Sequence, residues 1–361
     1  MKSKFYGVSR LLICCIALIL LATGCKKEAQ ENSFNNSAEK DYSTYVFFGS
    51  DSRSGEEDWL SDNTDPDKTS FSDVIMLLSV NEEKGDVRII SIYRDTMLDI
   101  AGDGSDFRKC NNAFANGGAY GAIDMLERNL DLQIEGYITA NFMTVANAID
   151  RLGGIDVDVE DQETSSDEYK ERGLTDVVST TNSYIDEMNK IYGTDTPHLE
   201  KAGVQNLTGL QAVAYSRVRY TIGSDMRRTE RQRNILALMA SKLKTADTNT
   251  QHDVLKQMYQ EADTDLSENE LMDMFDLLIG YDIDNIGGFP FYFEAIENKD
   301  KGVMFVPCDL NTNVKELHSY LYDNDSYAPS TTVSDYDELI KKETGLTAED
   351  ANEMLGSFGK N

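Results

Sequence analysis

Short apolar segments with the length of β-strands alternate along this chain with segments of helical periodicity. Strands are predicted at 42–48, 74–80 and 87–92, and the polar, glycine-containing link between the last two predicts a hairpin. Apolar residues recur at helical spacing in four longer segments, at 119–132, 142–152, 207–216 and 229–244. Strands and helices that interleave in this way are buried by layering, so we predict an α/β fold with helices on both faces of a sheet.

The first 25 residues predict a targeting signal rather than a part of the fold. A basic start precedes an uncharged, mostly apolar run at 11–23. A helix of that length cannot cross about 30 Å of hydrocarbon, but the run suits the core of a signal peptide. The run ends in LATGC, which is similar to a bacterial lipoprotein processing site with Cys25 as the lipidated residue. An uncleaved N-terminal anchor is the alternative. Both interpretations predict attachment at the extracytoplasmic face of the cell membrane.

Composition divides the rest of the chain into three further parts. Residues 26–40 are polar and predict a flexible linker, and one catalytic domain is predicted over 41–330. Within that domain the acidic segment 161–200 is interpreted as an insertion over one face, a candidate lid. Residues 331–361 are acidic and amphipathic and predict a peripheral tail. Cys110 and Cys308 could form a disulfide or remain two free thiols.

A cluster of arginines is the most informative charged feature, because the chain as a whole has a formal net charge of -30. Its members are Arg217, Arg219, Arg227, Arg228, Arg231 and Arg233. Guanidinium groups stay charged and can bond two phosphate oxygens at once. The cluster therefore predicts a ligand with concentrated negative charge, although a solvated basic helix face is the simpler alternative. The acidity of the whole chain argues against nucleic acid as the partner.

Three polar segments beside the predicted strands carry further candidate site residues. Asp51 and Arg53 follow the first strand, Asp73 precedes the second, and Arg94 follows the third. Ligands of open α/β sheets bind outside the ends of strands, which suits these positions. Each segment alone is more often a turn or cap, and Arg94 beside Asp95 could equally be a local ion pair.

Taken in order, these segments and the arginine cluster resemble the LytR-CpsA-Psr family of cell-envelope glycopolymer transferases. The matching segments are G-x-D-x-R at 49–53, S-D at 72–73, S-I-x-R-D-T at 91–96, K-x-N-x-A-x-x-x-G-G at 109–118, D-x-L-G-G-I at 150–155, L-x-G-x-Q-A-x-x-Y-x-R-x-R at 207–219 and D-x-x-R-T-x-R-Q at 225–232. The resemblance covers about residues 42–245 and continues through 306–318. Phe71 departs from the pattern, because many relatives have arginine there, and Tyr93 replaces the usual proline. The lipoprotein-like start also departs from the family's common transmembrane anchor.

The resemblance implies a three-layer α/β/α sandwich with a mixed central sheet and an apolar pocket for a polyprenyl tail. It implies a membrane-tethered phosphotransferase that moves a glycopolymer from a polyprenyl-pyrophosphate carrier to peptidoglycan and leaves a phosphodiester link. Polymers handled by relatives include wall teichoic acids and capsular polysaccharides. Positioned cations and a divalent metal are most of what such phosphoryl transfer asks of a protein.

Position in the family pattern also implies a role for each site residue. Asp51 and Asp73 are the expected ligands of Mg²⁺ or Mn²⁺, which prefer oxygen. The residues expected to bind pyrophosphate are Arg53, Arg94, Arg217, Arg219, Arg228, Arg231 and Gln232. Arg94 and Arg219 are also expected to be catalytic. Asp225 is either the N-cap of a helix or the general base for the acceptor hydroxyl.

Two other functions stay open at this point. The chain could capture a phosphorylated lipid or polymer without turnover, or it could hydrolyse polyprenyl pyrophosphate with the same metal and arginines. The pair Asp51 and Asp73 favours catalysis, because mere capture has little need of two carboxylates.

Overall fold

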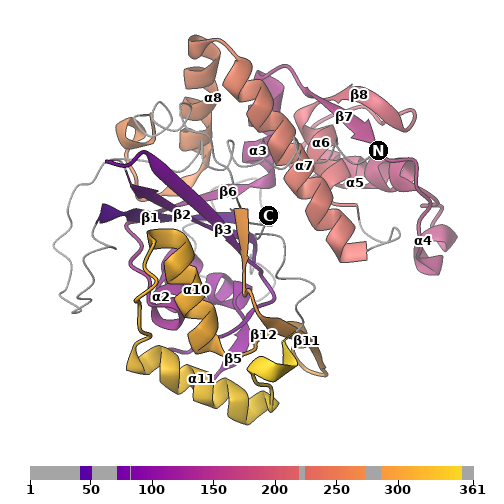
Figure 1. Cartoon of the computed structure of the whole chain (residues 1–361). Helices are drawn as coiled ribbons and strands as arrows, with labels where there is room; N and C mark the ends of the chain where they lie inside the picture. The colour runs from indigo at the N-terminus through magenta and orange to yellow at the C-terminus, as the bar shows by residue number, and fades with distance from the viewer. Residues whose placement is uncertain (1–40, 51–70, 82, 219–223, 273–285, 352–361) are drawn as a thin grey trace, which may run out of the picture.

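The structure, a computed structural model, describes residues 41–50, 71–81, 83–218, 224–272 and 286–351. Its centre is a six-stranded sheet in the order β10-β3-β2-β1-β6-β9, and Figure 1 shows helices on both of its faces. These strands are β1 (Ser43–Ser50), β2 (Ser72–Asn81), β3 (Asp86–Ile92), β6 (Gly136–Asn141), β9 (Asp263–Thr264) and β10 (Ile286–Phe289). Paired strands outside this sheet are β4 (Met97–Asp99) with β5 (Phe107–Lys109), β7 (Ile155–Val159) with β8 (Gly203–Leu207), and β11 (Phe293–Asn298) with β12 (Gly302–Pro307).

The central sheet is mixed. β2 runs antiparallel to both β1 and β3, so the predicted hairpin is confirmed. β6 runs parallel to β1 and β10 runs parallel to β3, whereas β9 is antiparallel to β6. The carboxyl ends of β1, β3 and β6 therefore lie at the same edge, together with the start of β2.

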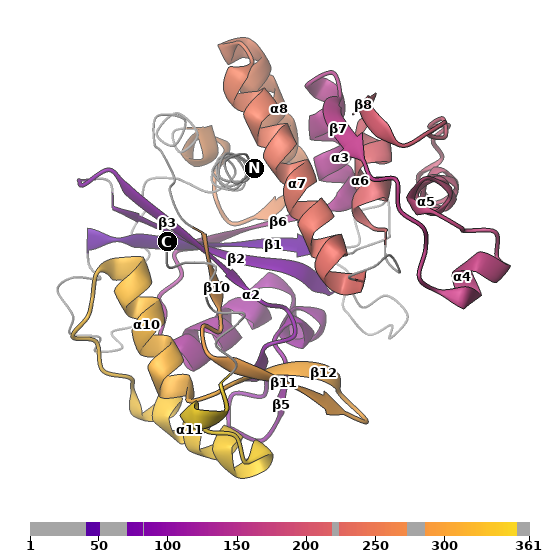
Figure 2. The ribbon, with the colours of Figure 1, turned by 45° about the vertical axis from the view of Figure 1, so that its right-hand side comes forward.

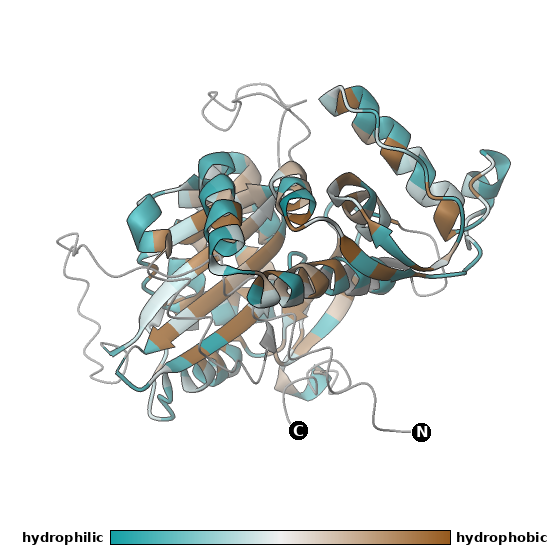
Figure 3. Ribbon diagram, turned by 90° about the horizontal axis from the view of Figure 1, so that it is seen from above, coloured by the Kyte–Doolittle hydropathy of each residue, from teal (hydrophilic) through white to brown (hydrophobic). Residues whose placement is uncertain are grey.

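Side chains alternate between the two faces of the sheet and enter two separate cores. Tyr45 and Phe47 enter the first core, and Val46 and Phe48 enter the second. The first core is covered by α3 (Phe142–Arg151), α5 (Val177–Tyr192), α6 (Gly209–Ser216), α7 (Ser224–Thr245) and α8 (Thr248–Glu261). The second is covered by α2 (Asn111–Leu130), α10 (Leu310–Tyr322) and α11 (Thr331–Thr344). The central strands are hydrophobic along most of their length (Figure 3), as strands covered on both faces must be. The predicted three-layer α/β/α sandwich is confirmed.

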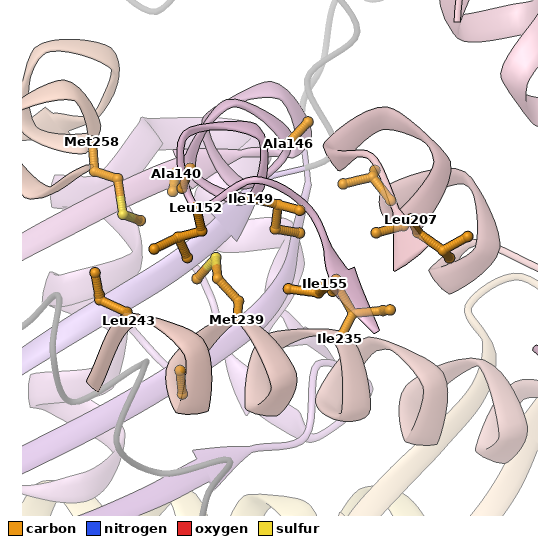
Figure 4. Packing of buried hydrophobic residues seen from close by; sticks show 14 of the residues in the cluster. Ala140, Ala146, Ile149, Leu152, Ile155, Leu207, Ile235, Met239, Leu243 and Met258 are labelled. Carbon is orange, nitrogen blue, oxygen red and sulfur yellow. The ribbon is translucent and has the colours of Figure 1, made fainter. Parts of the chain in front are cut away.

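Helix α7 places the arginine-rich segment of the chain. Its residues Ile235, Met239 and Leu243 are buried in the first core, where they face α3 (Figure 4). Their spacing forms one apolar face of the helix. The predicted helix at 229–244 is confirmed and begins earlier, at Ser224. Figure 2 shows its N-terminal end on the side of the sheet toward which β1 and β6 run.

Two of the family-like segments meet where α3 packs on α6. A Cβ at Gly209 would come 1.8 Å from the carbonyl oxygen of Ala146, so no larger residue fits there. The N–H of Gly209 donates to Oδ1 of Asp150 at 2.7 Å. A Cβ at Gly154, whose φ is +82°, would come 2.7 Å from the carbonyl oxygen of Leu207. Asp150, Gly154 and Gly209 therefore hold the helical layer together.

The segment 161–200 forms two helices that differ in burial. In α5 the side chains of Val177, Ile185 and Met188 are buried in the first core. In α4 (Asp167–Glu171) no residue is buried. Helix α5 is thus an integral part of the helical layer, and a lid would have to be formed by α4 and the loops around it.

The described part of the predicted peripheral tail packs on the domain. Helix α11 buries Val333, Tyr336 and Ile340 in the second core. Oδ1 of Asp337 in this helix accepts from the N–H of Leu310 at 2.7 Å. Because its apolar residues share one helical face, this acidic segment forms a covering layer instead of a peripheral tail.

Two further expectations can be compared with the structure. The aromatic composition of 289–293 predicts a single late strand there. This prediction is wrong, because β10 ends at Phe289 and β11 begins at Phe293. The N–H groups of Phe291 and Tyr292 between them donate to Oδ1 of Asn313 instead of to a neighbouring strand. In the described ranges no helix is long and apolar enough to cross a membrane. The predicted signal, Cys25 and the linker 26–40 lie outside these ranges.

Candidate functional site

A cavity of about 460 Å³ opens at the edge of the sheet where β2 begins and β3 ends. Its lining is almost entirely polar and charged. The lining residues are Phe71, Asp73, Arg94, Asp95, Arg108, Lys109, Asn111, Asn112, Asp300 and Lys301. Asp73 and Arg94, two of the residues predicted from the sequence, therefore face one cavity.

Three linked ion pairs lie in this cavity. Nη1 of Arg94 contacts Oδ1 of Asp73, and Nε of Arg94 lies 3.7 Å from Oδ2 of Asp95. Nζ of Lys109 lies 2.7 Å from Oδ1 of Asp95. The side chains of Arg94 and Asp73 are 22% and 14% exposed, so both remain accessible from the cavity. Partly exposed ion pairs of this kind contribute little to stability, and an incoming phosphate or metal ion can take over one partner.

The backbone after β3 fixes where Arg94 and Asp95 lie. The N–H of Tyr93 donates to the carbonyl of Phe289, and the N–H of Thr96 closes a turn onto the carbonyl of Tyr93, each at 2.9 Å. The carbonyl of Arg94 accepts from the N–H of Asn111 at 3.3 Å, at the start of α2. Strand end and helix start are thereby joined, which brings Lys109 to the cavity.

Cys110 lies beneath this turn and is a free, buried thiol. Its Sγ is 3.4 Å from the carbonyl oxygens of both Tyr93 and Arg94. Burial, together with the nearby Asp95, raises the pKa of this thiol. Cys308 is also free and buried. The structure therefore contains two free thiols at Cys110 and Cys308 instead of a disulfide.

Asp51 and Arg53 lie outside the described residues, so their predicted roles stay predictions. The last described residue before them, Ser50, pairs with Ser72, the neighbour of Asp73. The described end of β1 therefore lies next to Asp73, the residue that is expected to bind a metal ion together with Asp51.

Two described members of the arginine cluster, Arg227 and Arg231, lie beside Glu160 at the end of β7. The guanidinium of Arg231 is buried, with 2% of its side chain exposed. It donates to the carbonyl of Val218 at 2.9 Å and to Oε2 of Glu160 at 2.6 Å, and it lies 5.8 Å from the ring centre of Tyr215. These contacts tie the chain just before Arg219 to α7. Arg231 is thus held by partners within the protein, and its predicted contact with pyrophosphate stays a prediction.

Arg217 lies between two aromatic rings. Its guanidinium is 4.9 Å from the ring centre of Tyr184 and 5.5 Å from that of Phe142. Oε1 of Glu187 accepts from it at 3.4 Å. Two of these three partners, Tyr184 and Glu187, belong to α5. The segment interpreted from the sequence as an insertion therefore holds a predicted site residue in place.

The remaining predicted residues lie on α7 or just before it. Arg228 is buried, with 4% of its surface exposed, and Gln232 is half-buried. Asp225 lies in the first turn of α7, so the helix begins before it; its side chain and the whole of Arg219 lie outside what the structure describes. Nη1 of Arg227 lies 3.9 Å from Oε1 of Glu160.

Sequence reasoning missed several residues of the cavity. Lys109 and Asn111 stand in a recognised motif, and that motif could have marked them as site residues. Asp300 and Lys301 carry no such signal, because they lie in the turn between β11 and β12, far along the chain. Glu160 was missed because only the fold places it beside Arg231.

The donor set is compatible with a hard divalent cation. Asp73 presents a carboxylate to the cavity, and Mg²⁺ is commonly held by one or two carboxylates together with substrate phosphates. In the part of the chain that the structure describes, no group of three or more potential metal ligands gathers. Asp73 would thus need Asp51 or the substrate to complete a metal site.

The structure is thus an α/β/α sandwich with a charged cavity at the ends of its central strands. Residues 21–313 of the chain match the LytR_cpsA_psr family. The chain belongs to this family.

Relatives of the chain include named transferases. It is 24% identical over 265 residues to the polyisoprenyl-teichoic acid--peptidoglycan teichoic acid transferase TagV of Bacillus subtilis, a match that covers 72% of this chain and 61% of the relative. It is 30% identical over 217 residues to the corresponding transferase TagU of Halalkalibacterium halodurans, covering 60% of this chain and 58% of the relative. The chain thus spans about three fifths of the length of these relatives.

Solved structures confirm the fold. The crystal structure of Bacillus subtilis TagV superposes with a TM-score of 0.56 at 22% identity, over 80% of this chain and 99% of the other. A structure described as TagT bound to LIIa-WTA superposes with a TM-score of 0.54 at 19% identity, over 85% of this chain and 100% of the other.

Proposed function

We propose that this protein is a membrane-tethered phosphotransferase that moves an anionic or capsular glycopolymer from a polyprenyl-pyrophosphate carrier to peptidoglycan. The observation that carries the proposal is the cavity at the strand ends, in which Asp73, Arg94 and Lys109 lie together. The names of the family's relatives support the same class of reaction. Attachment through a lipid on Cys25 is part of the proposal, with an uncleaved N-terminal anchor as the alternative.

In the proposed reaction, a hydroxyl oxygen of peptidoglycan forms a new bond to the phosphorus that carries the glycan. The bond from that phosphorus to the bridging oxygen breaks, and polyprenyl phosphate leaves with the extra negative charge. Arg94 and Lys109 stabilise this charge, because cations already in position cost no rearrangement when the charge develops. Arg219 would add to them. Asp225 would accept the proton of the acceptor hydroxyl.

Asp73 and Asp51 would hold Mg²⁺, or Mn²⁺, against the two phosphates. Bound there, the ion would neutralise charge on the phosphate oxygens. The contact between Arg94 and Asp73 supports this arrangement, because it keeps the arginine and the carboxylate side by side where both would meet the diphosphate.

The direct test is transfer of a lipid-pyrophosphate-linked glycan to peptidoglycan by the full chain and by Asp73→Ala. We expect the variant to fold normally and to lose transfer, because the metal site loses a ligand. The exposed variant Asp103→Asn is the matched control and should retain activity. Undiminished transfer by Asp73→Ala would refute the metal assignment, and release of free glycan without attachment would identify a hydrolase instead.

A further inference from the structure

Asp95 lies between two cations of the cavity, and the proposed reaction gives it no role. Its Oδ1 is 2.7 Å from Nζ of Lys109, and its Oδ2 is 3.7 Å from Nε of Arg94. All three side chains are mostly buried but still reach the cavity. Each oxygen of this carboxylate therefore faces a different cation.

The backbone around Asp95 is fixed by contacts with β12 and with the start of α2. The carbonyl of Asp95 accepts from the N–H of Phe305 in β12 at 2.9 Å. The next residue, Thr96, donates its hydroxyl to the carbonyl of Tyr93 at 2.6 Å, and its own carbonyl accepts from the N–H of Cys110 at 2.8 Å. A single methylene joins the carboxylate to this backbone, whereas lysine and arginine have long side chains with many rotamers. Asp95 is therefore suited to fix where the two cations lie.

Arg94 meets its two carboxylates through different nitrogens. Nη1 contacts Asp73, whereas Nε faces Asp95. A phosphate that replaces Asp73 at Nη1 thus leaves the pair with Asp95 in place. Cations held in this way cost no rearrangement when charge develops on a phosphate.

We propose that Asp95 is a positioning residue of the transfer reaction, which acts through Lys109 and Arg94 and does not touch the substrate. The inference rests on the proposed function, because these two cations would stabilise the charge on the leaving phosphate. Lys109 is the main partner, since its Nζ is nearer to the carboxylate than Nε of Arg94.

The test is a double-mutant cycle on glycan transfer by the full chain in the presence of Mg²⁺. Asp95→Asn keeps the shape of the side chain and removes its charge, and Lys109→Met keeps an unbranched side chain without the charge. We expect Asp95→Asn to lower kcat about tenfold and to change KM less than about twofold, because misplaced cations lose most where charge develops. Lys109→Met should lower kcat about thirtyfold, and the double variant should lose no more than about threefold beyond that, because Asp95 acts through Lys109.

Asp86→Asn is the matched control. Oδ2 of Asp86 lies 2.7 Å from Nη2 of Arg88, so this carboxylate also belongs to a partly exposed ion pair. The pair lies at the start of β3, whereas the cavity lies at its end. Asp86→Asn should leave kcat and KM unchanged. Thermal denaturation of each variant reports the fraction of folded protein, to which the rates are normalised.

The outcomes separate this inference from the proposed function. If Asp95→Asn transfers glycan at the wild-type rate, or if its loss multiplies with that of Lys109→Met, the inference is refuted while the proposed function stands. A loss that disappears on normalisation to folded protein would refute it as well. A loss above about a thousandfold, with loss of the acidic limb of the pH–rate profile, would make Asp95 the general base and overturn the positioning role. If the wild-type chain transfers no glycan, the proposed function fails and the inference fails with it.

Discussion

The cavity at the strand ends and the arginine group between α6 and α7 hold their arginines in opposite ways. In the cavity, Arg94 pairs with Asp73, and both side chains stay partly exposed. In the arginine group, Arg231 is 2% exposed and bonds to Glu160 and to the carbonyl of Val218. One arrangement leaves a cation where a ligand can reach it, whereas the other uses a cation to join two segments of backbone.

The difference follows from what an arginine must do when it is buried. A buried guanidinium requires partners for its charge and for its N–H groups, and removing one partner is costly. A guanidinium at a cavity can exchange its carboxylate partner for phosphate at little cost. A cluster of arginines in a sequence thus indicates a charged region, but it does not show which of these arginines bind the ligand.

The largest expected effect concerns Arg94. Arg94→Ala should lower the rate of glycan transfer at least about a hundredfold, because about 3 kcal/mol of charge stabilisation is lost in the transition state. The melting temperature of the Arg94→Ala variant should stay close to that of the wild type, because the ion pair between Arg94 and Asp73 is partly exposed. Initial rates and thermal denaturation check both expectations. Arg151→Ala, exposed at the end of α3, is the control. An activity loss below about threefold would remove the contrast between the two regions.

Arg231 should show the reverse behaviour. Arg231→Met should lower the free energy of unfolding by about 2 kcal/mol, because Glu160 and the carbonyl of Val218 lose a buried partner. Glu160 is 24% exposed, which limits the loss. Urea denaturation of Arg231→Met, Glu160→Gln and the double variant measures the coupling. Strictly additive effects of the two changes would mean that the pair does not act as described.

Arg217 should show an intermediate effect that reports on α5. Tyr184→Leu removes one of the two rings beside its guanidinium and should cost about 1 kcal/mol of stability. Tyr169→Leu is the matched control, because Tyr169 also contacts an arginine but lies on α4, where no residue is buried. Its cost should be a few tenths of a kcal/mol at most. Equal urea midpoints for the two variants would contradict the role given to α5.

The two thiols provide the smallest effect. Burial raises the pKa of Cys308 from 9.0 to about 11. The folded state therefore keeps a proton that the unfolded state loses, so stability should fall as the pH rises from about 9 to about 11. In urea denaturations at a series of pH values, the free energy of unfolding of Cys308→Ser should fall less between about pH 9 and about pH 11 than that of the wild type. Alkylation at pH 8 should leave both thiols of the native chain unmodified and modify both after unfolding; rapid modification of Cys110 would mean that the turn under Arg94 opens.

Much of the fold could be predicted, because burial leaves a local pattern. The short apolar run within 42–48 and the helical spacing of 229–244 each indicated an element that the structure contains. Prediction was weaker where the structure of a segment depends on a contact with residues far away in the sequence. The segment at 289–293 has strand composition, yet Asn313 takes the N–H groups of two of its residues. The acidic segment after 330 was expected to be peripheral, yet three of its apolar residues reach the second core.

Only the part of the site that leaves a local pattern in the sequence could be predicted. Asp73 and Arg94 could be found because each lies at the end of an apolar strand. Asp300 and Lys301 could not, because a turn between two short strands gives no sign of what lies opposite it.

By itself, the sequence determined the layered α/β fold, the family and the residue types available for phosphate chemistry. These depend on local periodicity and on ordered motifs, which are written along the chain. Only the tertiary structure decided which arginines face a cavity and which are buried, and that the β11–β12 turn joins the site. Burial and pairing depend on segments far apart in sequence that the fold brings within a few ångströms, and no local pattern carries that information.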